Sequence, residues 1–219
     1  MNEEVSQQDP SSEPGPEPVL VLASASARRA QLLHQIGVAH CIVPADIDER
    51  RLAGESAEQC VIRLARSKAT QVRQRLATAQ SQEGRLPVLG ADTTVIVDEE
   101  MLGKPRDRQD ALAMLRRLSA RSHCVLSAVA LADDQTLTHA LSCSEVRFRA
   151  LSECECAAYW ESGEPHGKAG AYAIQGRGAQ FIEWLSGSYS GVMGLPLFET
   201  AQLLGQHGIV VMDSRRAPP

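Results

Sequence analysis

A single acidic residue stands inside a strongly apolar stretch in the middle of the chain. Asp92 lies in the segment GADTTVIV (90–97), whose other side chains are small or apolar apart from two threonines. An unpaired carboxylate buried there would cost several kcal/mol, so a cationic group must face it. Lys104, held between Gly103 and Pro105, is the candidate nearest in the sequence. The residues alone leave two interpretations open, a structural Asp–Lys ion pair and a catalytic site.

Two adjacent arginines occupy a second unusual position. The segment LASASARRAQLL (22–33) indicates a buried strand that turns through small residues into a helix, with Arg28 and Arg29 in the first helical turn. Unpaired N–H groups already make a helix N-terminus electropositive, so cations are disfavoured there unless an anion is near. A bound anion would gain both guanidinium groups and the free N–H groups. Solvated surface arginines are the alternative interpretation.

Further charges could complete a site for phosphate. Lys68 falls on or beside the apolar stripe of a predicted helix, where an ammonium is costly unless it meets an anion. Lys168 supplies another cation and Glu49 another carboxylate. A triphosphate with a divalent metal uses this mixture, because cations bind phosphate oxygens while carboxylates hold Mg²⁺ and activate water.

Other patterns are too incomplete to assign. GEPHGK (163–168) is one residue too short for a P-loop, and Ala169 follows it where Ser or Thr would ligate Mg²⁺. GRG (176–178) is too short for a dinucleotide fingerprint. Cys154 and Cys156 lack a second closely spaced ligand pair, so we interpret them as structural thiols rather than zinc ligands. The six cysteines of the chain are all expected to be reduced.

Composition excludes several classes of protein. The chain has 219 residues and a formal net charge of -5, but the first 18 residues hold five acidic and no basic side chains. The remainder therefore carries 22 acidic and 22 basic residues. A neutral body with 4% aromatic residues argues against a nucleic-acid partner. No secretory leader and no apolar run of membrane-spanning length is present in the sequence, so we expect a cytoplasmic protein without a membrane partner.

The chain is expected to form one folded domain over residues 19–212, for which 43% hydrophobic residues supply a core. Residues 1–18 are rich in Pro and Glu and are predicted to be a disordered acidic tail, because they cannot bury enough apolar surface to offset the entropy of ordering. Residues 213–219 are interpreted as a C-terminal tail.

Hydrophobic patterning predicts alternating strands and helices. Short apolar or alternating runs predict strands at 19–23, 41–43, 87–97, 123–131, 137–149, 171–175, 180–185 and 209–212. Capping residues and helical spacing predict helices that begin near Ser26, Ser56, Asp107, Ser152 and Pro196. A hairpin at Asp133 and Asp134 joins the two central strands, so we expect an α/β protein with a mixed sheet and flanking helices.

Five blocks of sequence stand in a distinctive order along the chain. They are LASASARRAQLL (22–33), GADTTVIV (90–97), LGKP (102–105), GEPHGKAGAYAIQG (163–176) and GSYSGVMGLPLFET (187–200). In order and spacing these blocks resemble the motifs of the Maf family of nucleoside triphosphate pyrophosphatases. The resemblance runs from about Val19 to Met212. It implies a fold related to the inosine triphosphate pyrophosphatases, with two lobes around a central cleft.

The resemblance also implies an activity and its site residues. The activity is hydrolysis of a nucleoside triphosphate to the monophosphate and pyrophosphate, with Mg²⁺ or Mn²⁺ as cofactor. The matching positions are Asp92 as proton acceptor, Ser24, Arg29, Lys68 and Lys104 for phosphate, Glu49 with Asp92 for metal, and Arg28, Thr93 and Gln175 for substrate choice. In the implied mechanism Asp92 takes a proton from water that attacks the α-phosphorus, while the cations stabilise the phosphate charge.

The block AYAIQG (171–176) resembles the branch of the family that acts on dTTP and UTP rather than on 7-methyl-GTP. A Gln amide can donate to O4 and accept from N3–H of thymine or uracil. The same amide turned over would suit cytosine, so the surroundings of Gln175 must fix its orientation. Modified pyrimidine nucleotides stay open as substrates. Without the resemblance, Gln175 would be interpreted as an ordinary strand residue.

Some positions depart from the family pattern. Ala27 stands where proline is usual, which makes the turn before the helix less rigid. Gly167 replaces an acidic residue, which leaves the partner of Lys168 undefined. The remaining departures are Ala120 and Ala128 for glycine and Gly191 for asparagine. They bear on efficiency and substrate preference more than on the class of reaction.

A nucleotide-sensing regulator of cell division that needs no turnover is the alternative to an enzyme. The same cations would serve both functions. Asp92 and Glu49 favour the enzyme, because carboxylates that face an anion gain little unless a metal intervenes. For the enzyme, the resemblance suggests roles in nucleotide-pool cleaning and cell division arrest. The sequence leaves open whether the chain forms a homodimer.

Overall fold

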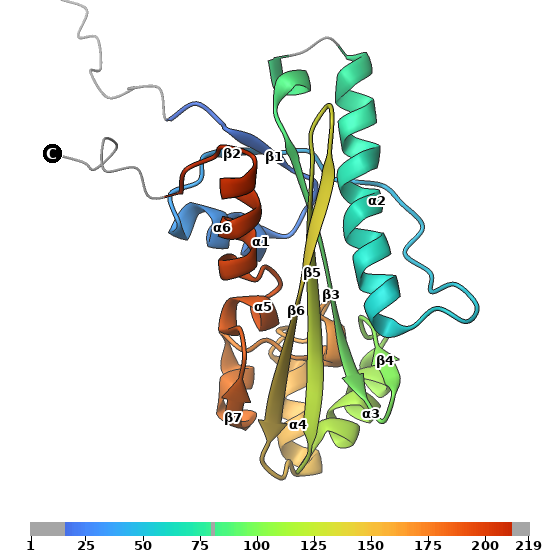
Figure 1. Cartoon of the computed structure of the whole chain (residues 1–219). Helices are drawn as coiled ribbons and strands as arrows, with labels where there is room; N and C mark the ends of the chain where they lie inside the picture. Colours follow the sequence, from blue (N-terminus) through green and yellow to red (C-terminus); the bar gives the residue numbers. More distant parts are fainter. Residues whose placement is uncertain (1–15, 80–81, 212–219) are drawn as a thin grey trace, which may run out of the picture.

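The computed structural model describes residues 16–79 and 82–211, and its centre in these residues is a sheet of seven strands (Figure 1). The strands are β1 (Leu20–Leu22), β2 (His40–Ile42), β3 (Val88–Val97), β4 (Glu100–Leu102), β5 (Ser122–Ala132), β6 (Leu137–Phe148) and β7 (Ile182–Ser186). Their order is β2-β1-β3-β5-β6-β7, with β4 paired to the end of β3. β1 runs parallel to β2 and β3, and the other pairs are antiparallel. The mixed sheet expected from the sequence is confirmed.

Helices flank the sheet. They are α1 (Ala27–Gln35), α2 (Ala57–Thr78), α3 (Arg108–Leu118), α4 (Glu153–Glu161), α5 (Tyr189–Met193) and α6 (Leu197–Gln206), with 3₁₀ turns η1 (Gln82–Arg85), η2 (Ala169–Ala171) and η3 (Arg177–Phe181). The capping boxes predicted at Ser56 and Ser152 are both formed. Ser26 occupies the N-cap of α1, but its side chain makes no capping bond.

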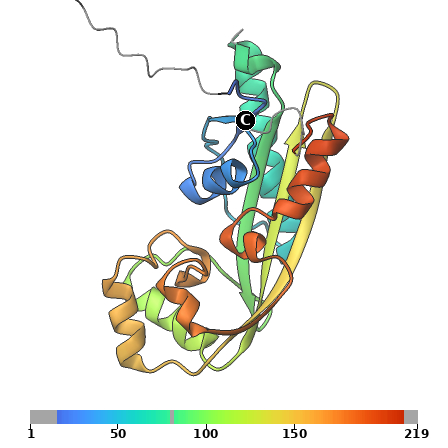
Figure 2. The ribbon, with the colours of Figure 1, turned by 90° about the vertical axis from the view of Figure 1, so that its left-hand side faces the viewer.

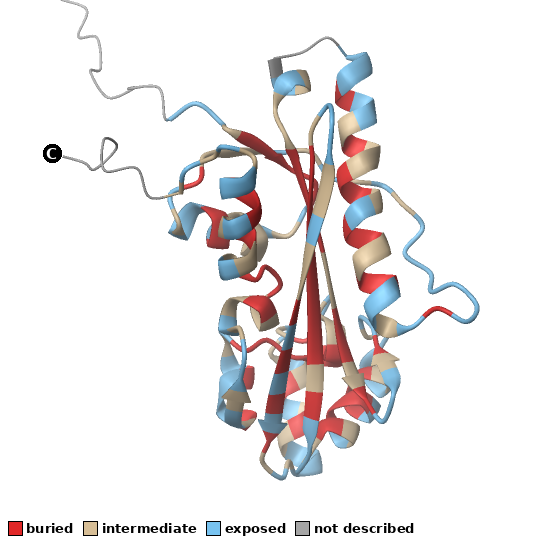
Figure 3. Ribbon diagram, viewed as in Figure 1, coloured by how far each residue is buried: buried red, intermediate tan, exposed pale blue. Residues whose placement is uncertain are grey.

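The long helix α2 covers one face of the sheet, and its inner stripe is buried (Figure 3). Ala65 and Ala69 on this stripe join a core cluster with Leu126 and Ala128 of β5. The helix approaches β3 so closely that a Cβ at Gly90 would lie 2.2 Å from the carbonyl oxygen of Ala65. Glycine at this position therefore sets the distance between α2 and β3.

The opposite face is covered by α1, α5 and α6 (Figure 1). A second lobe with α3, α4, η2 and η3 lies beside the lower end of the sheet (Figure 2). Its core contains an aromatic group in which Phe148 packs edge-on against Tyr172 and tilted against Phe181. The protein thus has the two lobes that the family resemblance implied.

Two predicted strands are wrong. Residues 171–175 begin in η2 and continue as irregular chain, because Gly170 and Ala171 have φ of 67° and 58° and because the Ala173 N–H donates to the Tyr159 hydroxyl. Residues 209–211 are not a strand, and Met212 lies outside the described residues. The short helix α5 was not anticipated from its glycine-rich sequence.

The proposed tails are mostly outside the described part of the chain. Residues 1–15 and 213–219 are not described, and 16–18 are exposed. Between residues 16 and 211, apart from the undescribed 80–81, no helix is both long and apolar enough to pass through a membrane.

Candidate functional site

A cavity of about 860 Å³ lies at an open edge of the sheet. β1 pairs with β3 as far as Leu89 and β4 pairs with β3 from Val95 onward, which leaves this edge of β3 unpaired between them, and residues 92–94 line the cavity there. The nine residues singled out from the sequence all line it: Ser24, Arg28, Arg29, Glu49, Lys68, Asp92, Thr93, Lys104 and Gln175. Segments far apart in the chain therefore converge on one space.

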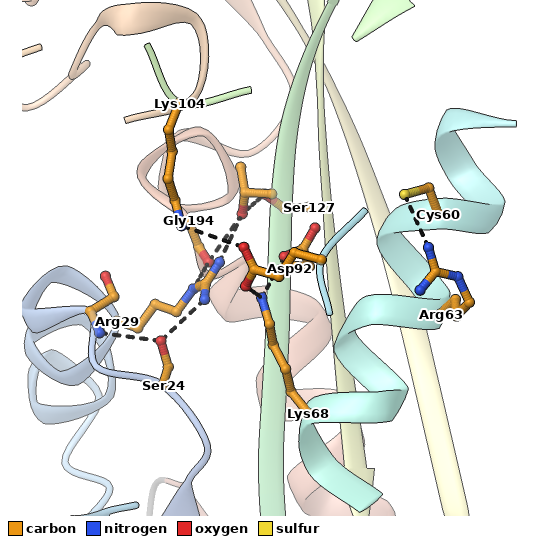
Figure 4. Close-up of polar contacts among 12 residues, drawn as sticks. Ser24, Arg29, Cys60, Arg63, Lys68, Asp92, Lys104, Ser127 and Gly194 are labelled. Atoms are coloured by element: carbon orange, nitrogen blue, oxygen red, sulfur yellow. Dashed lines mark hydrogen bonds and ion pairs between the residues drawn. The ribbon is translucent and has the colours of Figure 1, made fainter. Parts of the chain in front are cut away.

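Lys68 forms the centre of the charged network. Its ammonium lies 2.7 Å from Oδ1 of Asp92 (Figure 4) and 2.7 Å from Oε1 of Glu49. Lys68 is only 7% exposed, because the α2 stripe that carries it packs on β3. The expectation that this buried ammonium must meet an anion is confirmed.

Lys104 does not face Asp92, contrary to the expectation from their nearness in sequence. Its Nζ lies 3.5 Å from Oε2 of Glu49, and its side chain is 65% exposed. The loop after β4 carries Lys104 along the rim, whereas α2 brings Lys68 directly over β3. The partner of Asp92 is therefore set by helix–sheet packing.

Glu49 is held in its ionised form. Burial opposes ionisation of this carboxyl, but the hydrogen bond and charge of Lys68, helped by Lys104, outweigh it and lower the pKa of Glu49. Glu49 comes from the long loop between β2 and α2. The loop thereby brings a second carboxylate to the ammonium that Asp92 contacts.

Arg29 is anchored by three groups of the protein (Figure 4). Its Nε donates to the Gly194 carbonyl at 2.8 Å, Nη1 to Ser24 Oγ at 3.2 Å and Nη2 to Thr93 Oγ1 at 3.4 Å. Burial lowers the pKa of the Arg29 guanidinium, and the charges of Asp92 and Glu49 act in the opposite direction. Arg29 is thus a fixed cation in the wall of the cavity rather than a solvated surface arginine.

Arg28 lies beside it, with Nε 3.4 Å from the Met193 carbonyl oxygen. Burial lowers the pKa of this guanidinium too. Lys168 lines the cavity as well and donates to the backbone carbonyl of Glu164, which defines the partner that the sequence left open. Burial and the charge of Arg28 lower the pKa of Lys168. These cations repel one another, so the cavity favours an anion.

Gln175 reaches the cavity from the irregular segment between η2 and η3 and is exposed. Glu164 holds the chain just after it by accepting hydrogen bonds from the N–H groups of Arg177 at 2.8 Å and Gly178 at 3.0 Å. The Tyr159 hydroxyl donates to the same carboxylate at 2.6 Å. A tertiary network, rather than a strand, positions Gln175.

The carboxylates fit a divalent cation that is shared with a ligand. Within the described residues, no group of three or more His, Cys, Asp or Glu side chains could hold a metal. Glu49 and Asp92 do share one cation, the Lys68 ammonium. Mg²⁺ and similar ions are commonly bound by one or two carboxylates together with substrate phosphates, which suits this pair of oxygen donors.

Sequence reasoning missed several groups of the site. Ser127 of β5 is 1% exposed and donates to the Gly191 carbonyl at 2.6 Å. The Gly194 carbonyl, which accepts from Arg29, was missed because a backbone group leaves no mark on residue type. Ser127 did leave a signal, since it is a polar residue within the apolar run VLSAVALA (125–132).

Comparison with known proteins identifies relatives along most of the chain. A family model described as Maf-like protein matches residues 19–207. The dTTP/UTP pyrophosphatase of Methylobacillus flagellatus is 52% identical over 192 residues, covering 88% of this chain and 94% of the relative. The protein of the same name from Bordetella avium is 50% identical over 198 residues, covering 89% and 98%. That from Burkholderia lata is 53% identical over 195 residues, covering 85% and 92%.

Proposed function

The chain belongs to the Maf family, and from this premise we propose that it hydrolyses dTTP and UTP to the monophosphate and pyrophosphate. The observation that carries the proposal is the Glu49–Lys68–Asp92 network in a cavity that also holds Arg28, Arg29 and Lys104. A bound triphosphate would place its negative charge among these cations and its reacting phosphorus near a carboxylate base.

Asp92 is proposed as the proton acceptor for the attacking water. Lys68 holds its Oδ1, and Oδ2 accepts no hydrogen bond from the residues that the structure describes. The free oxygen can accept a proton while the other stays fixed, which orients the carboxylate. Glu49 and Asp92 would hold Mg²⁺ or Mn²⁺ together with phosphate oxygens, and the ion would supply charge neutralisation when bound.

The remaining cations are proposed to bind phosphate oxygens. Arg29 is prepositioned by Gly194, Ser24 and Thr93, so little reorganisation is needed when charge develops on the leaving pyrophosphate. Lys104, exposed at the rim, can approach the distal phosphates. Fixed donors of this kind contribute about 2 to 4 kcal/mol each to stabilising a transition state.

Gln175 is proposed to contact the pyrimidine, with Arg28 and Thr93 also affecting substrate choice. All three line the cavity, Gln175 from the second lobe and Thr93 from the sheet. The Glu164 network fixes the backbone that follows Gln175, and so fixes the place from which this side chain reaches the cavity. We also propose that the protein works in the cytoplasm. The nucleotide substrate is the partner that it requires.

A screen of nucleoside triphosphates with pyrophosphate detection tests the proposal. We expect turnover of dTTP and UTP that depends on Mg²⁺ or Mn²⁺. Hydrolysis in ¹⁸O-labelled water should place the label in the monophosphate, because water attacks the α-phosphorus. Label in pyrophosphate or release of orthophosphate contradicts the mechanism. Tight nucleotide binding without turnover would instead support the nucleotide-sensing regulator.

A further inference from the structure

Three side chains and a backbone carbonyl form a continuous series of hydrogen bonds behind the cavity wall. Thr93 and Ser127 are directly paired in the ladder between β3 and β5, and their hydroxyl oxygens lie 2.9 Å apart. Ser127 Oγ is 2.6 Å from the Gly191 carbonyl oxygen, and Arg29 Nη2 is 3.4 Å from Thr93 Oγ1. Ser127 is 1% exposed, so water does not compete for its proton.

The hydroxyl protons of Thr93 and Ser127 each have one direction that satisfies the whole series of hydrogen bonds. A carbonyl oxygen only accepts, so the single proton of Ser127 points to Gly191. The Ser127 oxygen must then accept from Thr93, because two oxygens 2.9 Å apart need a proton between them. Thr93 Oγ1 keeps only lone pairs for other partners, which suits the donor Nη2 of Arg29.

The alternative direction is less favourable. Thr93 could donate to the Gly194 carbonyl, but that oxygen is 3.4 Å away and already accepts from Arg29 Nε at 2.8 Å. If the Thr93 proton pointed to Gly194 in this way, no proton would lie between the Thr93 and Ser127 oxygens. The short bond from Ser127 to Gly191 therefore orders the whole series.

We infer that Ser127 is a positioning residue, which sets Thr93 as a hydrogen-bond acceptor and thereby fixes the guanidinium of Arg29 for a phosphate group. Three of the five guanidinium N–H groups bind Gly194, Ser24 and Thr93. One N–H on Nη1 and one on Nη2 remain for a ligand in the cavity that Arg29 lines. The inference rests on the proposed function for the identity of that ligand as a triphosphate.

Ser127 also connects β5 to α5 through Gly191, so a purely structural effect must be separated from the effect on Arg29. Ser144 of β6 offers a matched control. It is 2% exposed, and its hydroxyl contacts the backbone N–H and carbonyl of Ser188 at the start of α5 at 2.9 and 3.3 Å. Among the described residues, the Ser144 hydroxyl bonds to Ser188 and not to Thr93, so its removal loosens α5 without breaking the series of hydrogen bonds to Arg29.

A double-mutant cycle on kcat/KM for UTP tests the inference. Ser127→Ala is expected to lower kcat/KM by roughly 3- to 10-fold in the parent protein, the range of one net hydrogen bond. In a Thr93→Val background, Ser127→Ala should lower kcat/KM less than twofold, because Thr93→Val has already broken the series of hydrogen bonds between Ser127 and Arg29. Ser144→Ala should change kcat/KM by the same factor in both backgrounds. Ser127→Thr, which retains the hydroxyl, should restore most of the activity.

Equal losses from Ser127→Ala in the two backgrounds would overturn the inference and leave Ser127 as a support for α5 alone. Thermal unfolding shows which variants fold, and Ser127→Cys, a weak donor of similar size, replaces Ser127→Ala if the latter does not. If the parent protein turns over no nucleotide, the proposed function fails separately. The cycle is then measured on binding of inorganic tripolyphosphate by calorimetry, where coupling supports the inference and additivity or absence of binding overturns it.

Discussion

The same sheet buries polar groups in two different ways. At the open edge of β3, Lys68 is buried as an ion and meets two carboxylates. In the second lobe, His123 of β5 is 3% exposed, and its hydrogen-bond partner among the described residues is the Tyr172 hydroxyl, at 2.9 Å. Burial lowers the pKa of His123 to about 4, so this imidazole is neutral at pH 7.

The difference lies in what surrounds each group. His123 packs edge-on against the rings of Phe148 and Tyr172, with centroids 5.0 and 5.4 Å away, in a closed aromatic core. Its Nδ1 has no hydrogen-bond partner among the described residues. Lys68, by contrast, borders a cavity of about 860 Å³. Lys68 keeps its charge beside a cavity where a ligand can interact with it. His123 stays neutral because it packs inside a closed apolar core.

Among the changes that test this difference between the two buried groups, removal of the Lys68 ammonium should have the largest effect on activity. Lys68→Met keeps most of the side-chain length but leaves Asp92 and Glu49 facing each other without the cation between them. We expect kcat/KM for UTP to fall about 10²- to 10³-fold, measured by pyrophosphate release. Arg66→Met, which replaces an exposed cation two residues earlier on α2, is the control and should stay within twofold. A loss below tenfold for Lys68→Met would remove the ammonium from the centre of the site.

His123 should affect stability and its dependence on pH. Its folded pKa of about 4 lies below the unfolded value of about 6.5, so the unfolded state binds the proton first. This group's stabilising contribution is present above pH 6.5 and is lost as the pH falls toward 4. The free energy of unfolding should therefore drop by about 2 kcal/mol between pH 7 and pH 5 through this residue.

Urea unfolding at pH 7 and pH 5 gives the free energy of unfolding of the parent and of His123→Phe. The contribution of His123 is the difference between the two proteins in the slope of this free energy against pH. Phe replaces the ring but cannot titrate, so its stability should fall less on acidification. Equal slopes for the parent and His123→Phe would show that the lobe does not hold a neutral histidine.

Gly90→Ala should disturb the contact that places Lys68 over the sheet. The new Cβ would meet the Ala65 carbonyl oxygen at 2.2 Å and the Ala69 nitrogen at 2.7 Å, both backbone atoms of α2. We expect a loss of about 1 to 3 kcal/mol in the free energy of unfolding, together with lower activity. In α6, the Cβ of Gly205→Ala would meet no described atom within 4 Å outside the neighbouring backbone of its own helix, and this change should not destabilise the fold. Parent-like stability and activity for Gly90→Ala would show that α2 can move away freely.

Much of the site could be predicted because unusual residues stand out locally. Asp92 in an apolar strand, Lys68 on an apolar stripe and Arg28 with Arg29 at a helix start each violate a local rule, and the structure brings all of them to one cavity. Their roles stay predictions, as do the tails and the domain limits. The fold class followed from the alternation of patterns and from the hairpin, which β5 and β6 confirm.

What could not be predicted depends on contacts between distant segments. The pairing of Asp92 with Lys68 rather than Lys104 requires knowledge of how closely α2 approaches at Gly90. The segment 171–175 has the residue types of a strand, but Glu164 and Tyr159 satisfy backbone groups in and after it. Backbone acceptors such as the Gly191 and Gly194 carbonyls have no signature in residue type.

The central claim is that the open edge of β3 carries a base for hydrolysis, and Asp92→Asn tests it most directly. The amide keeps the shape and can still face Lys68, which retains Glu49 as an ionic partner. Pyrophosphate release from UTP at saturating nucleotide should fall about 10²- to 10⁴-fold, while UTP binding stays within tenfold of the parent. Release at the parent's rate would contradict the assignment of Asp92 and with it the account of this site.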